Sequence, residues 1–247
     1  MIKAILMGLL QGLTEFLPVS SSGHLVVLKH LLKIKEMGIE WEVFLHAGTL
    51  LSIIVYFNKR LLKYLKPKLL GLIIIASIPA GIVGLVFKDT LESFFSSPAL
   101  VIPSFVFTGI VLLIAGSRKE KNGKMPLWWQ ALLIGIAQSI ALVPGISRSG
   151  MSVSAGILLG LSFGSAFEFS FAMAVPALLG AFLLELHSTS FATIEIGPIL
   201  VGTLVSFLSG IFAIYVFRKI LIARKLQYFS IYLFLLSLLL PLLLVMR

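Results

Sequence analysis

The chain has no cysteine and few charged side chains. Of its 247 residues only 12% are charged, while 59% are hydrophobic and the mean hydropathy is +1.09. The missing cysteine excludes disulfides, thiolate metal sites and cysteine nucleophiles. A soluble domain has about 25% charged and about 45 to 50% apolar residues, so this chain has too little polar material to cover a soluble globule. The composition predicts an all-α, polytopic membrane protein embedded in a lipid bilayer.

Acidic residues are the scarcer of the charged types. Ten Asp and Glu stand against twenty Lys and Arg, which gives a net charge of +10. A basic excess can indicate nucleic-acid binding, but in so apolar a chain it favours basic cytoplasmic loops that face anionic headgroups. We therefore expect no nucleic-acid partner.

Apolar stretches divide the chain into spans and interrupted regions. A spanning helix needs about 20 apolar residues, with about 17 as a lower limit. Six stretches qualify, at 42–58, 69–87, 99–117, 165–187, 197–217 and 226–246. The regions 1–34 and 128–162 are also apolar, but Pro, Ser and Gly interrupt each near its middle. We expect each to form a re-entrant pair of half-helices around a polar turn.

The two halves of the chain repeat each other. An offset of 127 residues aligns Gln11 with Gln138 and Ser20 with Ser147, and it aligns the starts of the corresponding spans within a few residues. The single membrane domain 1–247 thus divides into repeats 1–127 and 128–247. Each repeat has three spans after its re-entrant pair, so the second should lie inverted in the membrane. Paired interruptions in inverted repeats indicate a site near the midplane.

Loop charges predict the orientation. Three loops on one side of this topology hold thirteen basic residues, namely Lys59, Arg60, Lys63, Lys66, Lys68, Arg118, Lys119, Lys121, Lys124, Arg218, Lys219, Arg224 and Lys225. The loops 88–98 and 188–196, on the other side, contain a single basic residue, Lys88. By the positive-inside rule the basic side is cytoplasmic, and both termini lie outside.

The two interruptions carry the candidate site. Gln11 and Glu15 share a helix face just before the first one, and Ser20, Ser21 and Ser22 lie where a new half-helix would begin, since serine is a favoured N-cap. His24 follows one residue inside that start, with Ser21 and Ser22 in the same turn, and the second interruption carries Ser147, Arg148 and Ser149. Converging helix N-termini and an arginine between them suit a phosphate group.

The two turns differ in chemistry. At the offset of 127, Ser21 aligns with Arg148, while Glu15 and His24 align with apolar residues. The first turn therefore supplies a carboxylate, a hydroxyl and an imidazole, and the second an anion clamp. This division favours a reaction on a phosphate over passage of an ion. A transporter or flippase for an anionic or lipid-phosphate substrate remains the alternative, because inverted repeats are typical of transporters.

Structural roles compete with these functional ones. Serines in such turns usually satisfy backbone groups, and buried charges can simply pair with one another. His46 and Glu168 lie near span ends and could equally support the site or face water. The four-spaced Gly8 and Gly12 are typical of close helix packing, and small-residue faces of this kind make a homodimer plausible.

The motifs resemble those of the undecaprenyl-diphosphate phosphatase family, the bacitracin-resistance phosphatases. The resemblance rests on the segment 11–24 (QGLTEFLPVSSSGH) and the segment 144–150 (PGISRSG), with a weaker match at 168–176 (EFSFAMAVP). It implies hydrolysis of undecaprenyl diphosphate to undecaprenyl phosphate and inorganic phosphate. This reaction recycles the lipid carrier of cell-wall synthesis in the inner membrane, with the site open to the extracytoplasmic side. It also implies a divalent cation, magnesium or calcium.

The resemblance matches Glu15, Ser21, His24 and Arg148 to catalytic residues. We expect Ser21 to be the nucleophile, His24 to move its proton and Glu15 to orient His24 or bind the metal, with Gln11 as a neutral ligand. His24 as nucleophile and direct attack by water remain alternatives. The other predicted substrate-binding residues are Gln11, Ser20, Ser22, Gly23, Gly145, Ser147, Ser149 and Gly150. The polyprenyl chain could lie between helices or in the bilayer.

Overall fold

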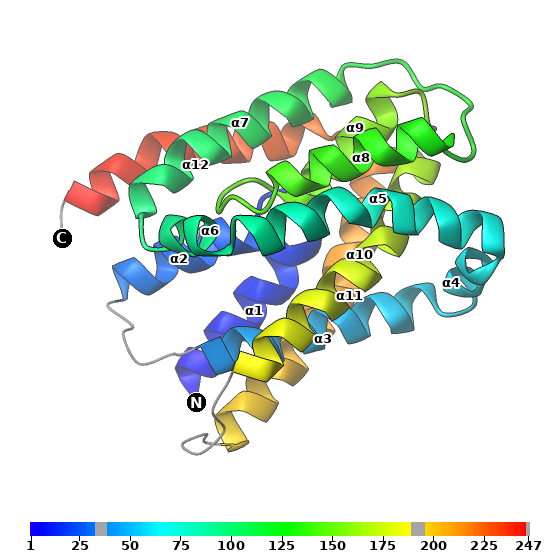
Figure 1. Cartoon of the computed structure of the whole chain (residues 1–247). Coiled ribbons are helices and arrows are strands. Elements are labelled where there is room, and N and C mark those ends of the chain that lie inside the picture. The colour runs from blue at the N-terminus through cyan, green and yellow to red at the C-terminus, as the bar shows by residue number, and fades with distance from the viewer. Residues whose placement is uncertain (33–38, 189–195, 246–247) are drawn as a thin grey trace.

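The computed structural model describes residues 1–32, 39–188 and 196–245, and their regular structure is helical apart from one isolated bridge. The segments are α1 (Ile2–Phe16), α2 (Ser21–Leu31), α3 (Ile39–Phe57), α4 (Lys59–Leu62), η1 (Lys63–Leu65), α5 (Pro67–Val86), α6 (Lys88–Phe94), α7 (Pro98–Gly116), α8 (Trp128–Ile140), α9 (Arg148–Leu158), α10 (Phe163–Ser188), α11 (Ile196–Ile222) and α12 (Gln227–Val245) (Figure 1). Parts of three predicted elements lie outside the described residues: 33–34 of the first pair, 189–195 of one loop and residue 246 of the last span.

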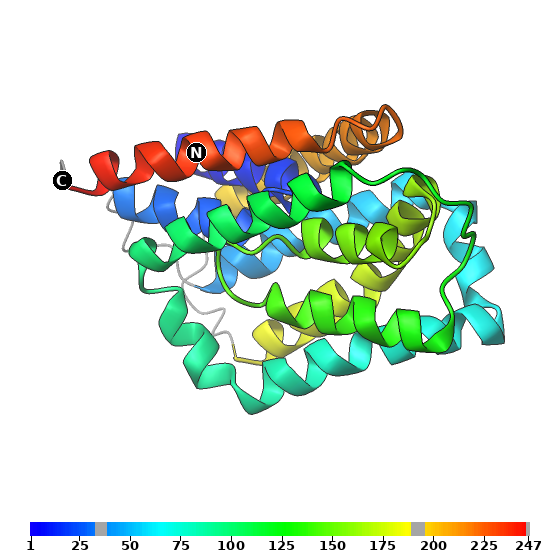
Figure 2. The same ribbon diagram turned by 90° about the horizontal axis from the view of Figure 1, so that it is seen from above.

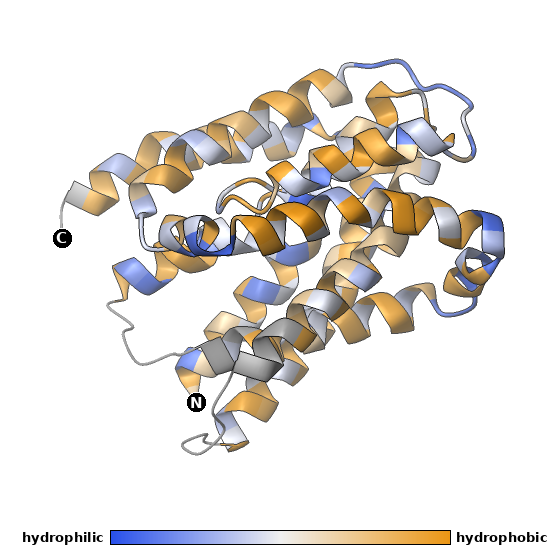
Figure 3. Ribbon diagram, in the orientation of Figure 1, coloured by the Kyte–Doolittle hydropathy of each residue, from blue (hydrophilic) through white to orange (hydrophobic). Residues whose placement is uncertain are grey.

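Among the described residues, five helices are long and apolar enough to cross a membrane: α5, α7, α10, α11 and α12. The predicted span 42–58 corresponds to α3, whose apolar part, Val43–Phe57, is shorter. Hydrophobic residues make up most of these helices (Figure 3), and many of them are exposed; Leu238, for example, is 72% exposed. Such surfaces are stable in lipid and not in water. The predicted all-helical, multi-pass membrane protein is confirmed at this level.

Both predicted interruptions separate two helices. The first half-helix, α1, ends at Phe16 before Pro18, and α2 begins at Ser21. In the second copy α8 ends at Ile140 and α9 begins at Arg148. Proline has no N–H to continue a helix, and the serines that follow cap the next one.

Helices of the two halves pack against each other (Figures 1 and 2). The first helix, α1, packs along α11, while its counterpart α8 packs along α5. Glycines make these contacts close: a Cβ at Gly8 would lie 2.4 Å from the carbonyl oxygen of Gly202, and one at Gly135 would lie 2.3 Å from that of Ala76. Gly8 and Gly12 thus serve packing within the chain, as predicted, so they give no support to a homodimer.

The basic connections gather at one end of the bundle. The α3–α5, α7–α8 and α11–α12 connections lie on the right of Figure 2, whereas both termini lie toward the left. Glu168 of α10 also lies near this end, where it forms an ion pair with Lys63. The sequence left open whether Glu168 supports the site or faces water. The ion pair with Lys63 places it away from the site.

Candidate active site

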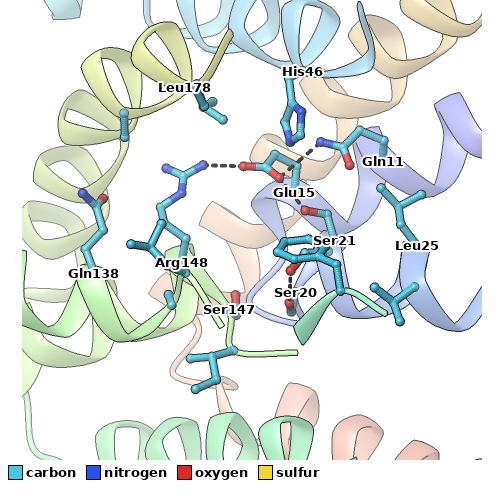
Figure 4. Close-up of a pocket in the computed structure, with 18 of the residues that line it drawn as sticks. Gln11, Glu15, Ser20, Ser21, Leu25, His46, Gln138, Ser147, Arg148 and Leu178 are labelled. Atoms are coloured by element: carbon cyan, nitrogen blue, oxygen red, sulfur yellow. Dashed lines mark hydrogen bonds and ion pairs between the residues drawn. The ribbon is translucent and has the colours of Figure 1, made fainter. Parts of the chain in front are cut away.

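A pocket of about 310 Å³ lies between the two interruptions. It is lined by side chains from both pairs of half-helices and from α5 and α10 (Figure 4). Seven of the predicted site residues line it: Gln11, Glu15, Ser20, Ser21, Ser22, Ser147 and Arg148. The structure thus brings residues more than 120 positions apart in the sequence into one cavity.

Glu15 is the centre of the hydrogen bonds in this pocket (Figure 4). Its Oε1 accepts a 2.7 Å hydrogen bond from the guanidinium of Arg148, and its Oε2 accepts a 2.5 Å hydrogen bond from Ser21 Oγ. The Gln11 amide also donates to Oε2, at 3.3 Å. The Arg148 and Glu15 side chains are 15% and 8% exposed. Pairing offsets the cost of burying either charge alone, and it links the two repeats.

The half-helices α2 and α9 point their N-termini toward the same region. Ser20 Oγ accepts from Gly23 N at 3.4 Å, and Ser147 Oγ accepts from Gly150 N at 3.1 Å, so among the serines of the two turns these two are the N-caps. Ser20 has a φ of 70°. A non-glycine residue in this left-handed region is strained, and such strain clusters at functional sites.

The predicted glycines lie where the two turns touch. A Cβ at Gly23 would lie 2.7 Å from Gly145 Cα, and a Cβ at Gly150 would lie 3.3 Å from Pro18 Cβ. Gly145 also has a φ of +91°. These three glycines and Ser149 do not line the pocket. Their position assigns them to the close contact of the turns, and Ser149 Oγ adds a 3.3 Å hydrogen bond to the Leu17 carbonyl.

His24 points away from the pocket. Its Nδ1 lies 2.7 Å from the Ser20 carbonyl oxygen and its Nε2 lies 2.7 Å from the Tyr232 hydroxyl. Its ring packs between Phe105 and Tyr232, with centroid distances of 5.0 and 5.8 Å. His24 does not line the pocket that contains Ser21, although the two residues are only three apart in the sequence.

Three polar lining residues were not among the predicted site residues, although His46 was one of the two residues that could either support the site or face water. Lys29, His46 and Gln138 line the pocket, and His46 lies beside Glu15 and Gln11 in Figure 4. Gln138 is 2% exposed, and neither atom of its amide has a hydrogen-bond partner. The repeat alignment that pairs Gln138 with Gln11 is the sequence signal that could have found it. For Lys29 we see no such signal.

The pocket offers a partial site for a hard cation. The described residues contain no group of three His, Asp or Glu side chains that could hold a metal. Gln11 Oε1, however, is buried without a partner next to the Glu15 carboxylate. Magnesium binds through one or two protein oxygens together with substrate phosphates and water. Glu15 and Gln11 fit a cation that is bound jointly with a phosphate group.

Fold and pocket together define the class: a multi-pass helical membrane protein with a buried polar pocket between two helix interruptions. Residues 4–239 match the family described as bacitracin resistance protein BacA, and the chain belongs to that family.

Relatives named undecaprenyl-diphosphatase match over most of their length. The protein from Carboxydothermus hydrogenoformans is 38% identical, and the match covers 95% of this chain and 94% of the relative. The one from Syntrophotalea carbinolica is 41% identical, with 94% of each chain covered. The one from Methanococcus maripaludis is 35% identical, with 95% and 97% covered.

Proposed function

We propose that this protein hydrolyses undecaprenyl diphosphate to undecaprenyl phosphate and inorganic phosphate. The observation that carries the proposal is the convergence of Arg148, Glu15 and Ser21 in one buried pocket. In this pocket the guanidinium of Arg148 supplies positive charge for the diphosphate, Ser21 supplies a nucleophilic hydroxyl, and the Glu15 carboxylate accepts the hydroxyl proton. The relatives named undecaprenyl-diphosphatase support the choice of substrate. By recycling this lipid carrier, the protein would confer bacitracin resistance.

Arg148 and Gln138 bind the diphosphate in this proposal. One terminal nitrogen of Arg148 pairs with Glu15, and the other, Nη1, is buried without a partner. Gln138 adds an amide donor, also without a partner. The N-terminus of α9 contributes its unpaired N–H groups and positive dipole end. Together these groups stabilise the negative charge on the transferred phosphoryl group.

Ser21 is the nucleophile in this proposal. Its Oγ attacks the terminal phosphorus, its proton passes to Glu15 Oε2 at 2.5 Å, and the bridging P–O bond breaks to release undecaprenyl phosphate. Water then attacks the phosphoserine phosphorus, the bond between phosphorus and Ser21 Oγ breaks, and Glu15 returns the proton to Ser21 Oγ. The protons of the attacking water stay on the phosphate, which leaves as dihydrogen phosphate. Direct attack by water, with Glu15 as the base, is the competing route through the same pocket.

His24 acts as a positioning residue and does not carry the proton. Its bonds to the Ser20 carbonyl and the Tyr232 hydroxyl hold the strained N-cap of α2 in place. Ser21 follows this cap directly. This arrangement differs from the role expected from the sequence, in which His24 moves the Ser21 proton or attacks phosphorus itself.

A divalent cation would bind to Glu15 and Gln11 Oε1 together with the diphosphate. It would neutralise negative charge on the phosphate oxygens. The described residues supply these two protein oxygens at adjacent turns of α1.

The topology belongs to the same proposal. The packing of α1 on α11 and of α8 on α5 relates the two halves as an inverted repeat would. With the basic connections in the cytoplasm of a bacterial inner membrane, the pocket would open to the opposite, extracytoplasmic side. A homodimer remains a prediction.

Phosphate release from undecaprenyl diphosphate by the purified protein in detergent tests the activity. We expect turnover in the wild type and a loss of about 100-fold in Arg148→Lys, because lysine keeps the charge but not the second donor. Arg224→Lys is the matched control, since Arg224 pairs with Glu120 on the exposed surface. Absence of turnover by the wild type would contradict the hydrolase and leave transport to be assayed in vesicles.

Trapping with substrate labelled on the terminal phosphate tests the nucleophile. We expect acid quenching to retain label on Ser21 in the wild type and none in Ser21→Ala, while Ser117→Ala, altered at an exposed helix end, behaves as the wild type. Turnover without any labelled protein would favour direct attack by water.

A further inference from the structure

A second cavity adjoins the pocket on the side of α5 and α10. It has a volume of about 470 Å³, and its lining is almost wholly apolar, including Leu70, Ile74 and Ile78 from α5 and Val175 and Leu179 from α10. The Ser77 hydroxyl in this lining donates to the Ile73 carbonyl of its own helix at 2.8 Å, so it offers no donor to a ligand. We call this cavity the α5–α10 groove.

The same two helices line the pocket and the groove. On α5 Ala80 lines the pocket, and Ser77 and Ile78 line the groove; on α10 Ala177 and Leu178 line the pocket, and Val175, Pro176 and Leu179 line the groove. Pro79 thus lies between the two sets of lining residues on α5, and Pro176 belongs to the groove lining on α10. A proline inside a helix removes a backbone hydrogen bond and bends the chain. Both helices therefore carry a helix-bending residue where the two cavities lie next to each other.

The equivalent interface in the other half of the molecule is closed. In the repeat alignment α3 and α11 correspond to α10 and α5. No proline lies in α3, and the proline of α11, Pro198, lies in its first turn, where a proline does not bend the helix. A Cβ at Gly48 of α3 would lie 2.5 Å from the Thr203 carbonyl oxygen. Ser52 Oγ donates to the Phe207 carbonyl at 2.8 Å, and Ser206 Oγ donates to the Leu45 carbonyl at 2.9 Å.

The glycines of α5 and α10 lack the close contacts that Gly48 makes. A Cβ at Gly71 or Gly81 of α5, or at Gly180 of α10, would meet no atom of another segment within 4 Å. One helix pair is therefore sealed by glycine contacts and hydrogen bonds, while its counterpart leaves an apolar cavity beside the pocket. The fold does not require this cavity, because the sealed pair shows that the same interface can close.

We propose that the α5–α10 groove binds the first part of the isoprenoid chain of a lipid diphosphate whose head group lies in the pocket. This inference rests on the proposed function for the identity of the head group. The apolar lining suits a hydrocarbon chain, and the pocket lies beside the groove on the same two helices, so a chain that leaves the pocket can reach the groove.

The direction of the groove fits such a lipid. At its far end the groove is lined by Leu61, Tyr64 and Leu65, which lie in the basic connection between α3 and α5. The groove therefore runs from the pocket toward the basic end of the bundle. A lipid with its head group on the opposite side of the membrane points its chain in this direction. On α5 the groove runs from Ile78 to Leu70, eight residue steps or about 12 Å of helix, so a C55 chain would extend beyond it into the bilayer.

Groove-filling variants test the proposal through chain-length selectivity. Ile74→Trp and Leu179→Trp place a large side chain in the groove, and Leu204→Trp is the control, because Leu204 of α11 is 56% exposed, as Ile74 is 53% exposed, and lines neither cavity. We expect the ratio of kcat/KM for undecaprenyl diphosphate to that for geranyl diphosphate, a C10 substrate too short to fill the groove, to fall about fivefold in the groove variants. It should stay at the wild-type value in the control.

Equal loss with both substrates would mean that the substitutions disturb the pocket, and an unchanged ratio would place the chain in the bilayer; either result overturns the proposal. A photoreactive undecaprenyl diphosphate with a diazirine in its first isoprene units tests binding without turnover. Labels should fall on α5 and α10. Labels spread over α7, α11 and α12, or labelling competed equally by phosphatidylglycerol, would contradict the groove. Labelling of α5 and α10 without phosphate release would instead reject the hydrolase and retain the groove.

Discussion

Replacing Gln138 with leucine should make the protein more stable and its reaction slower. Gln138 is 2% exposed, and both polar atoms of its amide lack a partner in the protein. Leaving a buried polar group unpaired costs about 1 to 3 kcal/mol. The pocket of about 310 Å³ is large enough to admit water, which satisfies part of the amide in the resting protein. We therefore expect a gain of about 1 kcal/mol in the free energy of unfolding, the lower end of that range.

The loss of activity should come from the nitrogen of the same amide. Leucine offers no donor to the diphosphate, and a neutral hydrogen bond to a charged group contributes about 1.5 to 3 kcal/mol. At about 1.4 kcal/mol per factor of ten, kcat/KM for undecaprenyl diphosphate should fall by about 10- to 100-fold. Phosphate release in detergent measures this change, and tryptophan fluorescence during denaturation in SDS measures the stability.

Gln130 provides a matched control on the same helix, α8. Its Oε1 accepts from Leu127 N at 2.7 Å, and its Nε2 donates to the Leu159 carbonyl at 2.9 Å. Because both atoms are bonded within the protein, Gln130→Leu should lower stability and leave kcat/KM unchanged. The reasoning is refuted if Gln138→Leu loses stability like the control, or if it keeps the wild-type kcat/KM.

Two further predictions concern the neighbourhood of the pocket. Gly23→Ala should destabilise the protein by about 1 to 3 kcal/mol, because its Cβ would lie 2.7 Å from Gly145 Cα; a melting temperature equal to the wild type's would contradict the contact between the turns. Tyr232→Phe removes the partner of His24 Nε2 and should lower kcat by less than about tenfold, since a general acid or base is worth about 100-fold or more. A bell-shaped pH–rate profile that loses one limb in Tyr232→Phe would return His24 to the role of proton carrier.

Much of the site was predictable from local features. Glu15, Ser21 and Arg148 lie at interruptions of apolar stretches, where proline and serine mark helix ends and where an ionisable residue in lipid needs a functional reason. The repeat alignment predicted that the two interruptions meet, and the ion pair between Arg148 and Glu15 shows that they do. These inferences need only hydrophobicity, spacing and chain order, which are properties of the sequence.

Side-chain direction was not predictable in the same way. Whether His24 faces Ser21 or Tyr232 depends on the rotation of α2 about its axis and on what α12 presents to it. For the same reason the sequence does not show whether Glu168 supports the site or faces water. Its ion pair with Lys63 places it at the basic end of the bundle. Gln138 has a repeat partner in Gln11, but only packing shows that its amide is buried without a bond.

The positions of the helices and of their interruptions therefore follow from hydropathy, proline, serine and the internal repeat, because each of these acts within a few turns of the chain. The interfaces α3–α11 and α5–α10 are related by the repeat. Packing between segments that are distant in the sequence decides which of them is tightly packed and which leaves a groove. Gly48 lets α3 approach α11, while Pro79 and Pro176 stand where α5 and α10 leave a groove. Two halves with the same order of elements thus form one sealed interface and one open interface, and that difference exists only once the chain is folded.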